Sequence, residues 1–165
     1  MDESESVADF YAAAAPRLVA LLTLTGSSRD DAEELVQDAF AKLLPRWTRV
    51  SAFDDPEAWV RRVALNMRVS RARRASVARR GLRLLSSRPT LPPPEPLADR
   101  LDLRQALRRL PEEQRTVLVL HYVTDLTAER ISADLGVPLG TVKSRLSRGR
   151  LALAQLMEEE VVPDA

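Results

Sequence analysis

The sequence predicts an all-α protein with two small helical domains joined by a proline-rich linker. Leucine, valine and alanine recur at intervals of three and four residues, which is the spacing of one helix face. Aromatic residues make up 4% of the 165 residues, and no long alternating run of β-branched residues indicates a strand. Prolines crowd the stretch 84–96, which therefore favours an extended, semi-stiff segment. We expect a first domain at 1–82, a linker at 83–97 and a second domain at 98–165.

The first 50 residues predict two helices with a break between them. Apolar residues at helical spacing indicate the first helix, and Pro16 is expected to kink it or divide it in two. The segment Gly26–Ser28 breaks the chain, and a hydroxyl there can cap the next helix. The second helix is expected at 30–44, with these apolar residues inside: Ala32, Leu35, Val36, Ala39, Phe40 and Leu43. Its other face carries polar side chains that point outward: Glu33, Glu34, Gln37, Asp38 and Lys42.

The next segment combines a loop with a strongly basic helix. A loop is expected at 48–57, followed by a helix that runs to about Arg80. We expect the buried stripe of this helix to consist of Trp59, Val60, Val63, Ala64 and Met67. Acids dominate the first 57 residues, whereas the span 58–94 contains many arginines and no acid. One acidic and one basic surface indicate two kinds of partner, and the basic surface suits a polyanion.

The C-terminal block predicts two helices joined by a tight turn. Leucines at helical spacing begin the block, and Pro111 follows them at the start of a further helix. Ile131 and Leu135 lie four residues apart on one face of a helix that Gly136 can end with a left-handed cap. Pro138 cannot continue this helix but can open the next one. The stretch 126–157 therefore reads as a helix-turn-helix.

The last predicted helix has two different faces. Its apolar stripe consists of Val142, Leu146, Gly149, Leu153 and Leu156, and a different face gathers Thr141, Ser144, Arg145 and Arg148. Arginine can bind a guanine edge through two hydrogen bonds, while hydroxyls and Lys143 can hold phosphate or reach neighbouring bases. This pattern is typical of a major-groove reader. Periodicity alone also fits an ordinary helical hairpin whose arginines form a solvated face.

Three motifs, in order along the chain, resemble the sigma factors of bacterial RNA polymerase. They are AEELVQDAFAKLLPRW at 32–47, WVRRVALNMRVSRARR at 59–74 and LGVPLGTVKSRLSRGRLAL at 135–153. The segment 106–127 also resembles the lead-in to the sigma helix-turn-helix. The resemblance is to the small two-domain extracytoplasmic-function (ECF) group of the sigma-70 superfamily, and it covers about 7–157. It implies sigma region 2 in the first domain and sigma region 4 in the second.

The resemblance implies that the chain binds core RNA polymerase and directs promoter-specific transcription initiation. The 32–47 helix would dock on the clamp coiled coil of the largest subunit, and the 106–127 block would receive the flap tip of the second-largest subunit. The implied docking residues are Glu34, Gln37, Asp38 and Lys42. Promoter DNA is the other expected partner, and an anti-sigma factor is the expected inhibitor. The free chain is expected to be a monomer.

The resemblance also assigns DNA contacts to both domains. Segment 59–74 would melt the −10 element, with Asn66 beneath a pocket for an extruded base and segment 48–55 setting which base fits. The implied −10 residues are Arg61, Arg62, Asn66, Arg68 and Arg71. The implied −35 residues are Thr141, Lys143, Ser144, Arg145, Ser147 and Arg148. Arg130 departs from the family, which usually has a carboxylate or a neutral residue there, and this affects the expected phosphate contacts.

The composition argues against an enzyme, a cofactor and a metal site. The chain has no cysteine, so it has neither a disulfide framework nor a thiolate zinc site. His121 is the only histidine, so no triad or histidine metal set can be built around it, and a structural role is expected. The acidic N-terminus lacks a signal pattern, and no apolar run is expected to approach membrane-spanning length. We therefore expect a cytoplasmic chain without membrane insertion.

Two other classes of protein could carry a helix-turn-helix. A transcriptional regulator that binds operator DNA by itself would explain this motif, but it leaves the acidic helix and the Asn66 segment unexplained. Such regulators generally dimerise on palindromes. A recombinase or nuclease needs a nucleophile or a cluster of metal ligands, and the sequence indicates neither a histidine set nor converging carboxylates.

Overall fold

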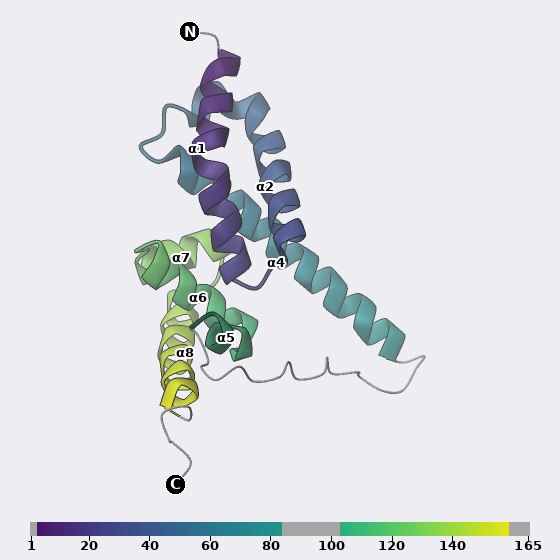
Figure 1. The fold of residues 1–165 in the computed structure, drawn as a ribbon, viewed down its shortest axis with the longest axis vertical. Helices are drawn as coiled ribbons and strands as arrows, with labels where there is room; N and C mark the ends of the chain where they lie inside the picture. Colours follow the sequence, from purple (N-terminus) through teal and green to yellow (C-terminus); the bar gives the residue numbers. More distant parts are fainter. Residues whose placement is uncertain (1–2, 84–102, 159–165) are drawn as a thin grey trace.

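The computed structural model describes residues 3–83 and 103–158, and within these ranges every regular element is helical (Figure 1). The N-terminal domain contains α1 (Glu3–Leu24), α2 (Arg29–Leu43), the 3₁₀ turn η1 (Leu44–Arg46), α3 (Trp47–Val50) and α4 (Pro56–Arg83). The C-terminal domain contains α5 (Leu103–Arg109), α6 (Glu112–Val123), α7 (Ala128–Leu135) and α8 (Leu139–Glu158). The all-α class is confirmed. After Arg83, the expected linker lies outside the described residues.

Helix α2 is the central element of the N-terminal domain and packs against both α1 and α4. All six residues expected on its inner face are buried. Ser28 caps the helix as expected, since its hydroxyl accepts a hydrogen bond from the Asp31 backbone N–H at 3.1 Å. Phe10 completes the core, with ring centroids 5.5 Å from Phe40 and 5.3 Å from Trp47. The inner face of α2 thus followed directly from the spacing of apolar residues.

Pro16 does not divide the first helix, so one of the two expected outcomes, the division, is excluded. Helix α1 continues through it from Glu3 to Leu24. Pro16 and Ala12 are both exposed, so water can satisfy the Ala12 carbonyl that loses its intrahelical donor. Buried Ala14 and Leu18 meanwhile anchor the helix on both sides of the proline.

The N-terminal helix is also more apolar than expected. The stretch Ser6–Leu24 is long and apolar enough to cross a membrane by length and composition, so the expectation of no such run was wrong. Within this structure 28% of an 18-residue apolar window of this stretch is buried, and α1 packs against α2. A core helix of a helical bundle passes the same test, so the stretch is weak evidence for a membrane span.

The segment between α2 and α4 is more ordered than the expected loop at 48–57. It forms the short helix α3, and only residues 51–55 lack helical structure. The buried stripe of α4 also differs from expectation, because Trp59, Val63 and Met67 are only half-buried. Two charged residues, Arg61 and Arg68, are buried instead. The far end of α4 projects beyond the other helices (Figure 1).

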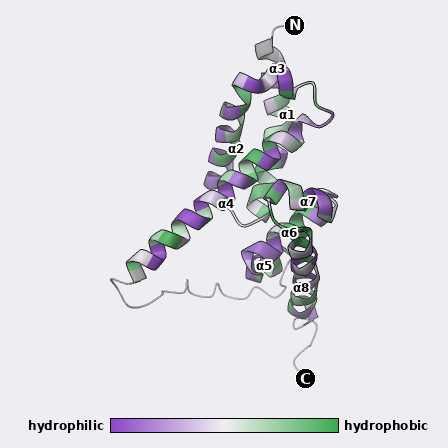
Figure 2. Cartoon of the chain, turned by 180° about the vertical axis from the view of Figure 1, so that it is seen from behind, coloured by the Kyte–Doolittle hydropathy of each residue, from purple (hydrophilic) through white to green (hydrophobic). Residues whose placement is uncertain are grey.

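The helix-turn-helix has the expected local chemistry. Thr127 caps α7 by accepting a hydrogen bond from the Arg130 backbone N–H at 3.2 Å, and Gly136 ends the helix at φ +65°. The Ser132 hydroxyl donates to the Val137 carbonyl at 2.6 Å, which fixes the turn. His121 pairs its Nδ1 with the Leu126 carbonyl oxygen at 2.8 Å, so it holds the loop before α7. Figure 2 shows purple and green residues mixed along α8, as expected for a two-faced helix.

The two domains pack against each other. Helix α7 lies against α4, and α6 lies against the end of α1 (Figure 1). Their buried apolar residues form one continuous cluster that includes Leu22 and Leu65 of one domain and Val117 and Ile131 of the other. The N-terminal and C-terminal domains therefore share one core.

Candidate nucleic-acid interface

The recognition helix α8 presents polar side chains on the side opposite its packed stripe. Val142, Leu146 and Gly149 are buried against the rest of the domain. A Cβ on Gly149 would lie 3.0 Å from Leu118 Cδ1, so the glycine lets α8 approach α6 closely. On the open side Lys143, Ser147 and Arg148 are exposed, and Thr141, Ser144 and Arg145 are half-buried. These are the six residues predicted for the −35 element, and the helix brings them together.

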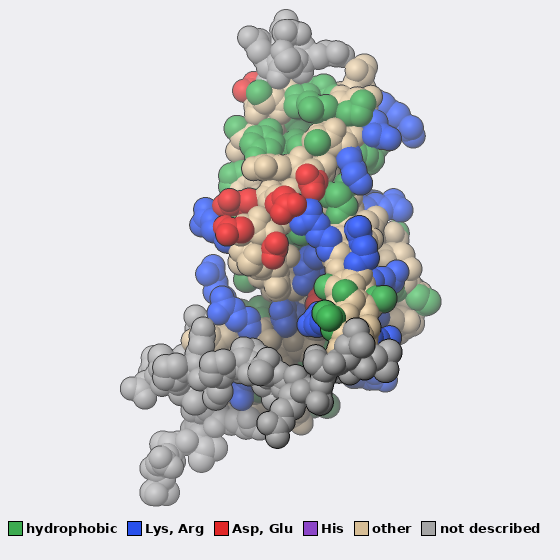
Figure 3. Space-filling model, turned by 90° about the vertical axis from the view of Figure 1, so that its right-hand side faces the viewer, with side chains coloured by type: hydrophobic (Ala, Val, Ile, Leu, Met, Phe, Trp, Pro, Cys, Tyr) green, Lys and Arg blue, Asp and Glu red, His purple; other side chains and the backbone are tan. Residues whose placement is uncertain are grey.

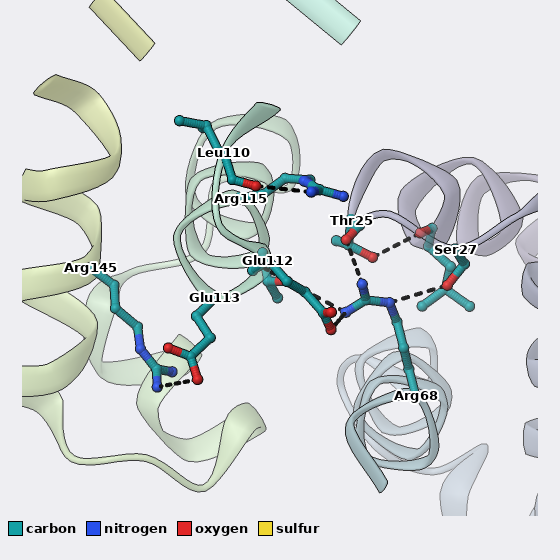
Figure 4. Close-up of polar contacts among 10 residues, drawn as sticks. Thr25, Ser27, Arg68, Leu110, Glu112, Glu113, Arg115 and Arg145 are labelled. Carbon is teal, nitrogen blue, oxygen red and sulfur yellow. Dashed lines mark hydrogen bonds and ion pairs between the residues drawn. The ribbon is translucent and has the colours of Figure 1, made fainter. Parts of the chain in front are cut away.

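Arg145 differs from the other candidates because it already has a partner. Its Nη2 lies 3.3 Å from Glu113 Oε1, at the start of α6 (Figure 4). The Glu113 side chain is 71% exposed, so solvent screens this pair and it adds little to stability. Arg150 is held on another side of α8, with Nε 2.6 Å from the Tyr122 hydroxyl. Arg148 is exposed and can approach a groove directly, whereas Arg145 could do so only after leaving Glu113.

Asn66 lines an open pocket in the N-terminal domain. The pocket has a volume of about 590 Å³ between α2, η1 and α4. Its other lining residues are Lys42, Arg46, Trp59, Val63, Met67, Ser70 and Arg74. An amide can hydrogen-bond a base edge, an indole can stack on a base, and three cations can hold phosphates. The pocket thus has the chemistry of a nucleotide site.

The pocket brings together residues to which the sequence assigned different roles. Lys42, predicted for polymerase docking, shares the pocket with Asn66, predicted for DNA. Trp59, expected in the core, lies half-buried in its wall. Sequence reasoning missed Arg46 and Arg74 as partners of Asn66. Arg46 comes from η1 and reaches the pocket only through tertiary packing, whereas Arg74 lies about two turns after Asn66 on α4 itself.

The acidic face of α2 is tied to α4 by an ion-pair network. Arg71 Nη2 lies 3.0 Å from Glu34 Oε1 and 2.9 Å from Asp38 Oδ2. A predicted −10 residue therefore pairs with two predicted docking residues. Gln37 lines a different groove, of about 620 Å³, between α1, α2 and α5. Figure 3 shows a red acidic cluster beside blue Lys and Arg side chains on one face of the molecule.

The remaining −10 candidates, apart from Arg62, face the other domain. Arg62 is exposed, whereas Arg61 is 8% and Arg68 is 7% exposed. Arg68 donates to the Thr25 carbonyl at 2.5 Å and pairs with Glu112 at 3.1 Å (Figure 4). Desolvation lowers the pKa of Arg68, and nearby Glu112 partly offsets this effect. Neither buried arginine can contact DNA while the domains are packed in this way.

Comparisons with known proteins find matches for both domains. The Sigma-70 region 2 family model matches residues 10–77, and the Sigma-70 region 4 model matches residues 100–153. The RNA polymerase sigma-E factor of Streptomyces coelicolor is 36% identical over 134 residues, which cover 81% of this chain and 74% of that protein. The ECF sigma factor SigW of Bacillus subtilis is 31% identical over 146 residues, covering 78% and 76%. The chain belongs to the ECF sigma factors.

A solved sigma-factor structure has a similar fold. The sigma factor RpoE from Bartonella quintana, crystallised with the anti-sigma factor NepR, matches with a TM-score of 0.71 and 25% identity. The match covers 93% of this chain and 98% of that chain, so it includes both domains. The expected family, the two-domain all-α class and the region 4 helix-turn-helix are therefore confirmed.

Membership of this family makes the chain a transcription initiation factor rather than a member of an enzyme family. Sigma factors act with core RNA polymerase on promoter DNA. In the described ranges 3–83 and 103–158, no group of three or more His, Cys, Asp or Glu side chains could hold a metal ion.

Proposed function

We propose that this sigma factor directs core RNA polymerase to its promoters by reading the −35 element with α8 and holding the melted −10 strand on α4. The observation that carries the proposal is the Asn66 pocket, where an amide, an indole and three cations surround a space open to solvent. A base removed from its stack needs such a combination of stacking, edge recognition and phosphate binding. The exposed loop 51–55, at the start of α4, would help to choose the base.

The −35 element would be read by the open face of α8. Arg148 and, once released from Glu113, Arg145 would bind base edges, and Lys143 and Ser147 would hold phosphates. Thr141 and Ser144 lie on the same side of the helix and would add shorter contacts. The capped turn before α8 would fix the angle at which the helix enters the major groove.

Core polymerase would bind mainly through the polar face of α2. Glu34, Gln37, Asp38 and Lys42 remain the proposed residues for the clamp coiled coil of the largest subunit. The α5–α6 region would receive the flap tip of the second-largest subunit. We propose that the free chain is a cytoplasmic monomer without catalytic activity and that an anti-sigma factor inhibits it. Domain limits at 1–82 and 98–165 with a linker at 83–97 also remain part of this proposal.

In-vitro transcription tests the proposal directly. Purified core polymerase is supplied with a genomic promoter library, with and without this chain. Discrete start sites that require both proteins are expected, and their shared upstream sequences would give the −35 and −10 elements. Tight binding of the free chain to duplex palindromes without core-dependent initiation would overturn the proposal and favour a regulator that acts alone.

A further inference from the structure

Arg68 joins the two domains at the end of α1. Its guanidinium bonds the Thr25 carbonyl at 2.5 Å and the Ser27 hydroxyl at 3.1 Å in its own domain. From the other domain, Glu112 lies 3.1 Å from Arg68 Nη1. Figure 4 shows the arginine rising between the loop after α1 and the start of α6. One side chain of α4 therefore holds three elements.

The same junction is closed by Arg115 from the C-terminal domain. A Cβ on Gly26 would clash with Arg115 Nη1, so this guanidinium packs directly on the Gly26 backbone. Arg115 also donates to the Leu110 carbonyl at 2.9 Å. Burial lowers the pKa of Arg115, again with a partly opposing effect from Glu112. The junction thus places one buried guanidinium group, from Arg68, and one half-buried group, from Arg115, beside one carboxylate.

A second contact joins α4 to the first helix of the helix-turn-helix. Arg61 Nη2 lies 3.9 Å from Asp134 Oδ2, and the two side chains are 9% and 1% exposed. Arg130 approaches the other carboxylate oxygen at 3.2 Å. Among the described residues, neither oxygen of Asp134 has a hydrogen-bond partner, and Arg61 Nε also lacks one. Within this part of the chain, the charge of the buried Asp134 carboxylate is opposed by the guanidinium groups of Arg61 and Arg130.

Both contacts occupy arginines that the proposed function assigns to DNA. Arg61 and Arg68 lie on the segment that would bind the −10 strand, while Arg62, between them in sequence, stays exposed. A carboxylate and a phosphate bind a guanidinium through similar charged oxygens. Glu112 and Asp134 therefore stand where phosphate oxygens of a bound strand could stand.

We propose that the free sigma factor is closed by its own C-terminal domain, with Glu112 and Asp134 substituting for DNA phosphates on Arg68 and Arg61. The chain then binds the −10 strand well only after its domains separate. The closure is inferred from the contacts between the domains alone, whereas its effect on DNA binding rests on the proposed function. The closed contact also keeps α8 and α4 from being placed independently on the two promoter elements.

The polar part of this interface suits a reversible closure. Buried ion pairs contribute little net stability when their desolvation is not repaid by full hydrogen bonding. In the part of the chain that the structure describes, both carboxylate oxygens of Asp134, Arg61 Nε and Arg115 Nε lack hydrogen-bond partners. The positive charges of Arg68 and Arg115 also repel each other. A partner that supplies better ligands to these groups can therefore shift the population towards the open form.

Förster transfer between two dyes measures closure without using DNA. The chain contains no cysteine, so Arg49→Cys and Leu151→Cys place one dye on an exposed site of each domain. The labelled chain is expected to show high transfer when free. Glu112→Gln with Asp134→Asn is expected to lower the transfer, because both interdomain carboxylates are neutralised. Low transfer in the parent chain, or equal transfer in both, would overturn the proposal.

The matched control removes the same charge elsewhere in the domain. Asp125→Asn with Glu129→Gln neutralises two exposed carboxylates, and asparagine tolerates the left-handed φ of +52° at position 125. Transfer is expected to stay at the parent value. Circular dichroism checks that each variant is helical, and Glu112→Gln alone, at a side chain 48% exposed, is a milder opening variant. An effect of equal size in the control would mean that charge rather than contact sets the transfer.

Binding of a mixed-sequence single-stranded oligonucleotide tests the masking. The Glu112→Gln/Asp134→Asn chain is expected to bind about 3–10-fold more tightly than the parent, since a larger fraction is competent to bind. The control pair must change binding less. Opening without tighter binding would overturn the masking. If no variant directs initiation with core polymerase, the proposed function fails, while a change in transfer would still establish the closure.

Discussion

Arg145, Arg148 and Arg150 lie close together on α8, yet the structure gives each a different surrounding. Arg150 bonds the Tyr122 hydroxyl and its guanidinium carbon lies 5.7 Å from the Tyr122 ring centroid. Arg145 pairs with Glu113, and Arg148 is exposed. The periodicity of the helix predicted that the first two belong to the DNA face. The partners of Arg145 and Arg150 come from α6, so the spacing of residues in α8 could not reveal them.

Removing Arg145 or Arg148 is expected to weaken promoter discrimination. For Arg145→Ala or Arg148→Ala we expect a loss of about 1–3 kcal/mol if the side chain contacts a base edge. Arg150→Ala is the matched control and is expected to leave discrimination nearly unchanged, because Arg150 is held by Tyr122. Initiation by reconstituted holoenzyme is compared on promoters with single −35 substitutions. A loss of equal size on every promoter would identify a phosphate contact instead.

At the scale of elements, patterns were most reliable where one helix face is apolar. The inner face of α2, the Ser28 cap and the Gly136 cap were all predicted, because each depends on neighbours in sequence. Pro16 does not divide α1, and the expected loop at 48–57 is shortened to 51–55, since packing on Leu18 and Trp47 stabilises helix where local preference is weak. Of the cations that line the Asn66 pocket, Lys42 and Arg46 reach it only because α2 and η1 lie beside α4, whereas Arg74 is on α4 itself.

Two glycines of α8 test how closely this helix packs. A Cβ at Gly149 would lie 3.0 Å from Leu118 Cδ1, whereas a Cβ at Gly140 would meet nothing within 4 Å. Gly149→Ala is expected to lower the free energy of unfolding by about 1–3 kcal/mol through overpacking. Gly140→Ala is expected to be neutral or to raise it by about 0.4–1 kcal/mol, since alanine has less conformational freedom than glycine to lose on folding. Denaturant titration of both variants gives the comparison, and equal effects would contradict the close approach.

Asp38 on α2 tests the docking face. Asp38→Arg is expected to weaken binding to core polymerase, because it reverses a charge on the proposed contact surface while leaving the buried face of α2 unchanged. The substitution also removes the 2.9 Å pair with Arg71, so Arg71→Gln serves as the control. That variant loses the pair but keeps the carboxylate, and core affinity is expected to stay close to the parent value. Titration of dye-labelled core polymerase with each variant measures both affinities. Unchanged affinity for Asp38→Arg would remove Asp38 from the docking surface.

For the whole molecule, sequence predicted the parts but not their arrangement. The motifs occur in family order, and the two family models match 10–77 and 100–153. The packing of α7 on α4 depends on Arg61 and Asp134, which are far apart in sequence. Charged residues in an arginine-rich helix are usually solvated, so the sequence favoured exposure for Arg61 and Arg68. Only the three-dimensional structure shows that both are buried by the other domain.

The Arg61–Asp134 contact can be tested by replacing charge with apolar volume. Arg61→Met alone leaves the buried Asp134 carboxylate opposed only by Arg130, and losing one member of a buried pair costs about 3–5 kcal/mol. Arg61→Met with Asp134→Leu is expected to recover most of that loss, because neither buried charge remains and the two apolar side chains can pack. The free energy of unfolding of the four chains forms a double-mutant cycle. A coupling near zero would mean that the two side chains do not interact in the folded chain. A strong coupling, together with high dye transfer in the double variant, would show that the domains close through this contact and that its charges limit how tightly they do so.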